Sequence, residues 1–152
     1  TRRSEGIMEP KIFTVQEAND AIPKVVALFD RIFHLNERIK AVSKDMQELM
    51  DIWGEDVLEG SNPDNKFYFE KLKLREDCFE ELREKIDELH KSGCVVKDLN
   101  EGLVDFYHDN RGEMVYLCWR YGEEQIRFWH TLTGGFVSRR SLEDLQKIEK
   151  KV

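Results

Sequence analysis

An apolar heptad pattern between Ile22 and Trp53 constrains the fold of this chain more than any other feature. Residues seven apart fall on one side of a helix of 3.6 residues per turn, and three such columns make a wide apolar stripe. Asn36 and Ser43 interrupt one column. They lie either in a packed seam, where polar residues fix register or association state, or at a partly wet edge. The columns are Val25, Ile32, Ile39, Met46, Trp53; Ile22, Phe29, Asn36, Ser43, Met50; and Leu28, Leu35, Val42, Leu49.

Thr14 and Glu17 predict where this helical region begins. A Thr followed three residues later by Glu forms a capping box, in which each side chain accepts from the other residue's backbone N–H. Pro23 follows within the helical pattern, where it removes a backbone donor and crowds the preceding turn. We therefore expect a short helix over 15–21 and a long helix from Pro23, separated by a break or a kink.

A second long helix follows the loop at 54–64. Asn62 is a favourable N-cap and Pro63 a favourable first helical residue, and the helix should run to about Lys91 and stop at Gly93. The acids between Glu76 and Glu88 form either a solvated outer face or a docking surface for a basic partner. The apolar stripe of this helix, with Arg75 intruding, is Tyr68, Leu72, Phe79, Leu82, Ile86 and Leu89.

The two helices predict an antiparallel hairpin over 12–92 that is longer than a compact domain of this size needs. Such a hairpin leaves part of its apolar stripe uncovered. The cover is either the rest of the chain or a second copy of the protein. We expect a homodimer or higher homo-oligomer with the hairpin in the interface, because symmetric dimers are the commonest solution.

The second half of the chain, 93–140, predicts a small antiparallel β-meander. Strands are expected at 94–98, 102–108, 113–120 and 125–130, with a last extended piece at 136–137, because β-branched and aromatic runs alternate with turn residues. The 113–120 strand is apolar on both faces, so both faces of the sheet should be covered. A capping box at Ser141 predicts a C-terminal helix over 142–151.

These elements predict an α+β protein: a long antiparallel helical hairpin packed on a small antiparallel sheet, with a short C-terminal helix. We expect one domain over 1–152, divided into a mobile N-terminal extension at 1–10, the hairpin at 12–92, the meander at 93–140 and the helix at 141–152. A length of 152 residues is typical of a single domain.

Charge and cysteine usage exclude several classes of function. The chain has 31 acids and 24 bases, a net charge of −7, which disfavours nucleic-acid or anionic-membrane partners, and no apolar run reaches the length of a membrane span. Three cysteines without a C-x-x-C pair disfavour a disulfide framework and favour a reducing cytoplasm.

Four stretches together resemble a known family. They are 13–19 with Pro23, 96–106, 115–123 and 129–139, which include the sequences Gly-Leu-Val-Asp-Phe, Leu-Cys-Trp and Trp-His. The chain is similar over residues 12–142 to the prokaryotic family known as domain of unknown function 2203. The resemblance implies a cytoplasmic prokaryotic protein, assigns no activity, and supplies no catalytic residues.

The candidate binding residues all lie in the predicted sheet half. His108 and His130 with Asp98, Asp105 or Glu123 have the donor types of a metal site, but their spacing matches no short metal motif, so we expect no metal and no cofactor. Arg139, with Arg127 or Arg140, could hold a carboxylate or phosphate between tryptophan walls. The alternative for each residue is a structural role. The candidates are Asp98, Asp105, Trp119, Glu123, Trp129, His130 and Arg139.

No catalytic residue is identified from the sequence. Cys118 paired with His130 has the atoms of a nucleophilic pair, yet a cysteine within so apolar a strand is typical of an inert core. No phosphate loop, nucleophile elbow or dinucleotide fingerprint is present. We expect a non-catalytic cytoplasmic binding or protein-interaction module that self-associates through the hairpin, with a protein or anionic small molecule as a further partner. The alternative is a small enzyme that binds a metal or an anionic small molecule in the β half.

Overall fold

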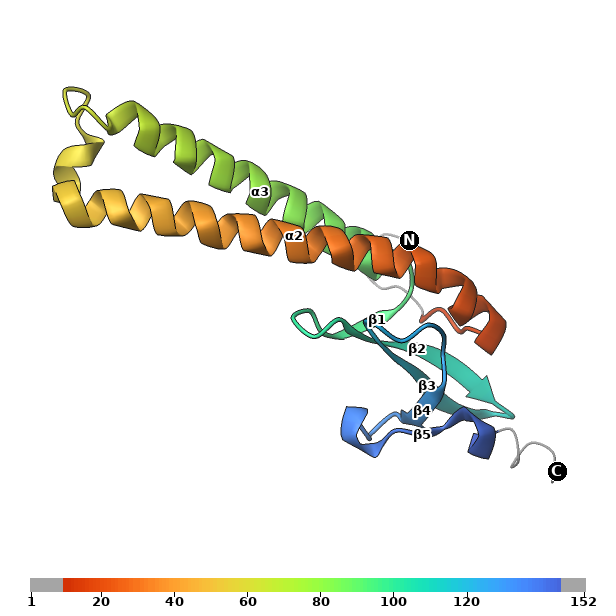
Figure 1. Ribbon diagram of the computed structural model, residues 1–152. Helices are drawn as coiled ribbons and strands as arrows, with labels where there is room; N and C mark the ends of the chain where they lie inside the picture. The colour runs from red at the N-terminus through yellow and green to blue at the C-terminus, as the bar shows by residue number, and fades with distance from the viewer. Residues whose placement is uncertain (1–9, 146–152) are drawn as a thin grey trace. The chain divides into compact units, whose positions relative to one another are not determined.

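The computed structural model describes residues 10–145 and contains two long helices followed by a five-stranded sheet, an α+β fold (Figure 1). The expected mobile extension falls almost wholly on residues 1–9, outside the described part. The elements in chain order are α2 (Val15–Trp53), η1 (Gly54–Leu58), α3 (Asn65–Lys91), β1 (Val95–Asp98), β2 (Leu103–Asn110), β3 (Glu113–Arg120), β4 (Phe128–Thr131), η2 (Phe136–Ser138) and β5 (Arg140–Ser141).

Helix α2 begins at the predicted capping box. The Thr14 N–H donates to Glu17 Oε1 over 2.9 Å, and the Glu17 N–H donates to Thr14 Oγ1 over 3.0 Å. Of the break or kink expected at Pro23, the break was wrong, because α2 is one helix of 39 residues that includes this proline. The neighbouring Ile22 and Val25 are buried, and burial of such side chains offsets the hydrogen bond that proline cannot make.

Helix α3 ends at Lys91 as predicted, and Gly93 follows with a φ of 98°. Its start was placed too early. Asn62 Oδ1 accepts from the Asp64 N–H over 2.8 Å, which closes a turn, and the helix begins only at Asn65. A polar side chain that bonds to the backbone two residues on favours a turn as readily as a helix cap.

The chain divides into two compact units. One unit is Asp30–Asp87, which contains most of α3 and the second part of α2, and the other comprises residues up to Phe29 together with those from Glu88 onward. The second unit therefore contains the whole sheet and the first turns of α2. Among the described residues no helix is long and apolar enough to cross a membrane.

The sheet is an antiparallel meander in the order β1-β2-β3-β4-β5. The strand expected at 125–130 starts only at Phe128, and the piece expected at 136–137 belongs to the 3₁₀ turn η2, with the last strand at Arg140–Ser141. Residues 142–145 are helical, and the rest of the predicted C-terminal helix lies outside the described residues.

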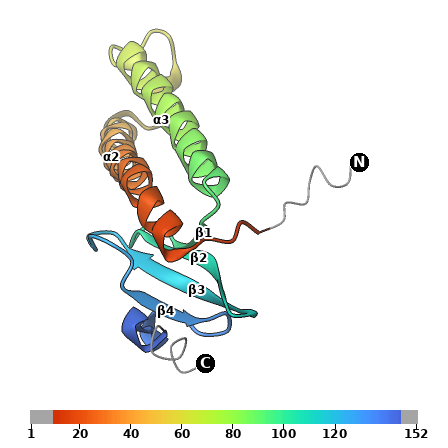
Figure 2. The ribbon, with the colours of Figure 1, turned by 90° about the vertical axis from the view of Figure 1, so that its right-hand side faces the viewer.

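One face of the sheet packs on the first turns of α2 (Figure 2). The Phe29 ring lies 6.4 Å from the Trp119 ring, and Phe13, just before the helix, lies 4.9 Å from Phe106 in an edge-to-face contact. Asn19 Oδ1 also accepts from the Ile126 N–H over 2.7 Å. The five central residues of β3, 115–119, are all buried, so both of its faces are covered as predicted.

Candidate functional site

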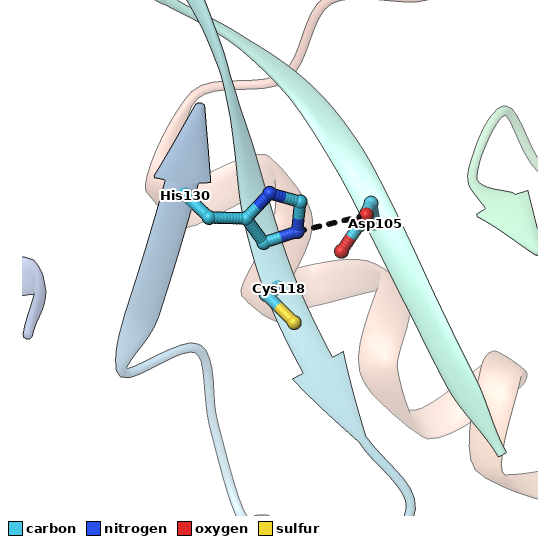
Figure 3. A group of neighbouring side chains, drawn as sticks. All are labelled: Asp105, Cys118 and His130. Carbon is cyan, nitrogen blue, oxygen red and sulfur yellow. Dashed lines mark hydrogen bonds and ion pairs between the residues drawn. The ribbon is translucent and has the colours of Figure 1, made fainter. Parts of the chain in front are cut away.

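Three adjacent strands bring Asp105, Cys118 and His130 together on the sheet face opposite the one that packs on α2 (Figure 3). Asp105 of β2 lies directly opposite Cys118 of β3. His130 of β4 lies opposite Tyr116, two residues from Cys118 and therefore on the same face. One ligand-type atom from each of the three side chains lies within 4.8 Å of the other two. We call these three residues the sheet cluster.

The sheet cluster is closed to solvent. Asp105 is 1%, Cys118 0% and His130 2% exposed. Both ring nitrogens of His130 have partners: Nδ1 lies 2.7 Å from the Thr131 carbonyl oxygen, and Nε2 lies 3.0 Å from Asp105 Oδ2. A carbonyl oxygen only accepts, so Nδ1 carries a proton and donates it. The contact between Nε2 and Oδ2 then holds one further proton, on the imidazole or on the carboxyl.

Burial dominates the acidity of the sheet cluster. The pKa of Asp105 is raised because burial disfavours its charged form, although the nearby His130 and Lys97 lower it. The pKa of Cys118 is raised to about 12, first by burial and then by the neighbouring Asp105 carboxyl, while Arg139 lowers it. Asp105 Oδ1 is buried and has no hydrogen-bond partner among the described residues.

A second pair, Glu123 and Arg139, lies beside the sheet cluster. Arg139 Nη1 donates to Glu123 Oε2 over 2.8 Å. The guanidinium carbon lies 4.0 Å from the ring centroids of both Phe128 and Phe136. The charge of Arg139 also acts on the Cys118 thiol. Of the predicted site residues, Asp105, Glu123, His130 and Arg139 thus form two bonded pairs with Cys118 between them.

The other predicted site residues lie elsewhere. Trp119 and Trp129 point to the opposite face of the sheet, where Trp119 Nε1 donates to the Glu123 carbonyl over 2.9 Å. Asp98 is exposed at the end of β1, and its Oδ1 accepts from the N–H groups of Asn100 and Glu101. The two tryptophans therefore do not form walls around the sheet cluster.

Cys118 was missing from the residues predicted from the sequence. The turn between β2 and β3 is the feature that reveals the position of Cys118, because it sets the register of the two strands. Arg111 and Gly112 both have positive φ, 55° and 92°, the pattern of a two-residue type I′ hairpin turn. Such a turn pairs Asn110 with Glu113, and this register places Asp105 opposite Cys118.

The geometry of the sheet cluster does not support nucleophilic catalysis. Both nitrogens of His130 contact oxygen atoms rather than the Cys118 sulfur, and the thiol is buried and held protonated. A nucleophilic pair needs an accessible thiol within hydrogen-bond reach of its base. The nitrogen, oxygen and sulfur donors are instead those that hold a transition-metal ion in proteins.

The hairpin unit carries the other candidate surface, on α3. Contacts between α2 and α3 fix the packing of the two helices: Arg31 binds Glu81 through two hydrogen bonds of 2.6 and 2.7 Å, and Arg75 Nη1 donates to Ser43 Oγ over 3.3 Å. The buried side chains of α2 in this unit include Leu35, Val42, Met46 and Leu49. The stripe of α3 is less covered: Phe79 is 42% exposed, and Tyr68, Leu72, Leu82 and Ile86 are only half-buried.

Comparison with known proteins identifies one family. The family described as an uncharacterized conserved protein, DUF2203, matches residues 11–142, which confirms the resemblance seen in the sequence. No curated protein and no solved structure matches the chain. Because the match covers most of its length, the chain belongs to the DUF2203 family.

Proposed function

We propose that this protein is a non-catalytic binding module of the cytoplasm of a prokaryote that self-associates through its helical hairpin. The observation that carries the proposal is the open stripe of α3. Its column Leu72, Phe79 and Ile86 repeats every seven residues, so it runs along the helix for about 21 Å at 1.5 Å per residue. Phe79, at the centre of this column, is 42% exposed.

A second copy of the hairpin is the occupant that fits this stripe. A two-fold axis near Phe79 places the column against itself, and two antiparallel hairpins then form a four-helix bundle. Exposed charges of opposite sign on the two helices are compatible with this arrangement, although Lys40 is also ion-paired with Glu37 of its own helix. These exposed charges are Lys40, Lys44, Glu76 and Glu80.

The closed sheet cluster supports the non-catalytic part of the proposal. An enzyme must expose its reacting groups to substrate, and the Asp105, Cys118 and His130 side chains are at most 2% exposed. Three buried free cysteines are typical of a reducing compartment. The alternative, a small enzyme that binds a metal or an anionic molecule in the β half, requires the sheet cluster to open.

Phe79→Glu tests self-association. In a two-fold interface, the carboxylates introduced at position 79 of the two copies would be buried close together and repel each other. We therefore expect the wild-type protein to sediment as a dimer at micromolar concentration and the variant to sediment as a folded monomer. The matched control is Phe69→Glu. Phe69 is equally exposed on the same helix, but its position ten residues earlier turns it about 80° from Phe79. A monomeric wild type, or equal effects of both substitutions, would overturn the proposal.

A further inference from the structure

We propose that the sheet cluster, Asp105, Cys118 and His130, binds one divalent transition-metal ion, with Zn²⁺ the best fit. This inference concerns the sheet and is independent of self-association through the hairpin. The buried ion would link the neighbouring strands β2, β3 and β4 through one side chain of each.

The first argument is the donor set and its spacing. Zn²⁺ in proteins binds thiolate sulfur at about 2.3 Å and imidazole nitrogen or carboxylate oxygen at about 2.0–2.2 Å. Tetrahedral bonds of these lengths place the ligand atoms roughly 3.3–3.7 Å apart. The three donors already lie within 4.8 Å of one another, and His130 Nε2 lies 3.0 Å from Asp105 Oδ2. For an ion to bind all three donors, the widest pair must approach by up to about 1 Å and the His130–Asp105 pair must separate slightly.

The second argument is the orientation of His130. Histidines that bind metals through one ring nitrogen usually donate the other N–H to a carboxylate or a backbone carbonyl, which fixes the tautomer and the ring plane. Here Nδ1 donates to the Thr131 carbonyl over 2.7 Å, so Nε2 points at the cluster with its lone pair free to bind once the shared proton leaves. The outer partner of a metal-binding histidine is thus already in place.

The third argument is the buried oxygen of Asp105. Its Oδ1 has no hydrogen-bond partner among the described residues, although the side chain is 1% exposed. Leaving a buried acceptor unsatisfied costs about 1–3 kcal/mol, more for a charged group. The only described donor that acts on the free side of this carboxyl is the weakly donating Cys118 thiol, and a cation between Asp105, Cys118 and His130 would replace it with a stronger partner.

Charge and proton balance are consistent with a divalent ion. Binding breaks the S–H bond of Cys118 and releases the proton held between Nε2 and Oδ2, so two protons leave to solvent for each ion bound. The thiolate and carboxylate then neutralise the two charges of the ion. Of the nearby cations, Arg139 is paired with Glu123, and Lys97, 4.0 Å from Asp105 Oδ2, is exposed to solvent.

Cobalt provides the test, because Co²⁺ occupies zinc sites and reports its ligands by absorption. The experiment titrates chelator-stripped, untagged protein with Co²⁺ alone and then with Zn²⁺. We expect one Co²⁺ per chain, a thiolate-to-cobalt charge-transfer band, visible d–d bands, and loss of all these bands when Zn²⁺ displaces the cobalt. Asp105→Asn and His130→Gln should each weaken Co²⁺ binding by at least about tenfold.

Matched cysteine variants identify the sulfur ligand. Cys118→Ser should abolish the charge-transfer band, whereas Cys94→Ser, which changes another buried thiol of the same unit, should keep it. The double variant Cys78→Ser/Cys94→Ser leaves Cys118 as the only thiol and should also keep the band. This variant shows whether Cys118 is the sulfur ligand even if Cys118→Ser does not fold. Wild-type protein that binds no Co²⁺, binding without a thiolate band, or a band that persists in folded Cys118→Ser would overturn the proposal.

Discussion

At the residue scale, Arg139 shows how the sheet half holds a charged side chain away from water. Its guanidinium carbon lies 4.0 Å from two aromatic ring centroids, of Phe128 and Phe136, while one nitrogen donates to Glu123. A planar guanidinium can stack on rings and form an ion pair at the same time, which an ammonium group cannot reproduce. The local order of the η2 turn and β4 therefore depends on arginine at this position.

Arg139→Gln should lower the free energy of unfolding by about 1.5–3 kcal/mol, because it removes both ring contacts and leaves the Glu123 carboxylate without its cation. Urea denaturation measures the change. Arg140→Gln is the control: this neighbouring arginine is exposed and lies 5.6 Å from a single ring, that of Trp129, so its loss should cost less than about 0.5 kcal/mol. Equal losses from the two substitutions would contradict this account of Arg139.

The three cysteines give a second residue-scale prediction. All three are buried and free, so the native protein should react with an aromatic disulfide reagent at fewer than one thiol per chain within minutes, and at three thiols after denaturation. Cys118→Ser should reduce the denatured count to two without raising the native count. Fast reaction of one thiol in the native protein would show that the structure opens at that cysteine.

At the element scale, helix α2 contains Pro23 in its interior without ending there. Proline is less favourable than alanine in a helix interior by about 3 kcal/mol, and it recovers part of this by restricting the unfolded chain. The sequence pattern therefore predicted a break or a kink. It could not weigh this local cost against the burial of Val25, Leu28 and Phe29, which depends on how the sheet folds.

Pro23→Ala should raise the free energy of unfolding by about 1–2 kcal/mol, since the side chain is exposed and the substitution restores a backbone donor to the helix. The shift of the urea midpoint reports the gain. Lys24→Ala, at the next exposed position, should change stability by less than about 0.5 kcal/mol. A loss of stability in Pro23→Ala would show that the helix requires the proline geometry.

At the scale of the whole molecule, local signals predicted the order of the elements well. The capping box at Thr14 and the stop at Gly93 each act over a few residues, and the structure confirms both. What the sequence did not show is which residues meet across strands. Asp105 and Cys118 are thirteen positions apart, and a shift of one residue in the β2–β3 register would separate their faces.

The candidate site was predicted only in part because its side chains pair with partners on other strands. Asp105, Glu123, His130 and Arg139 were all selected by residue type, but their division into two bonded pairs depends on a register fixed by the fold. Cys118 was set aside because its neighbours in sequence are apolar, whereas its neighbours in space are Asp105 and His130. The apolar stripe of α3 was predicted from the sequence, whereas its exposure is seen only in the structure.

In the proposed dimer, two copies of the hairpin cover each other's α3 stripe. Native mass spectrometry of the purified full chain at low micromolar concentration tests it most directly, because the mass counts subunits. We expect a species at twice the chain mass of 18.1 kDa, which Phe79→Glu converts to single chains. A wild-type protein that stays at the single-chain mass across micromolar concentrations would contradict it.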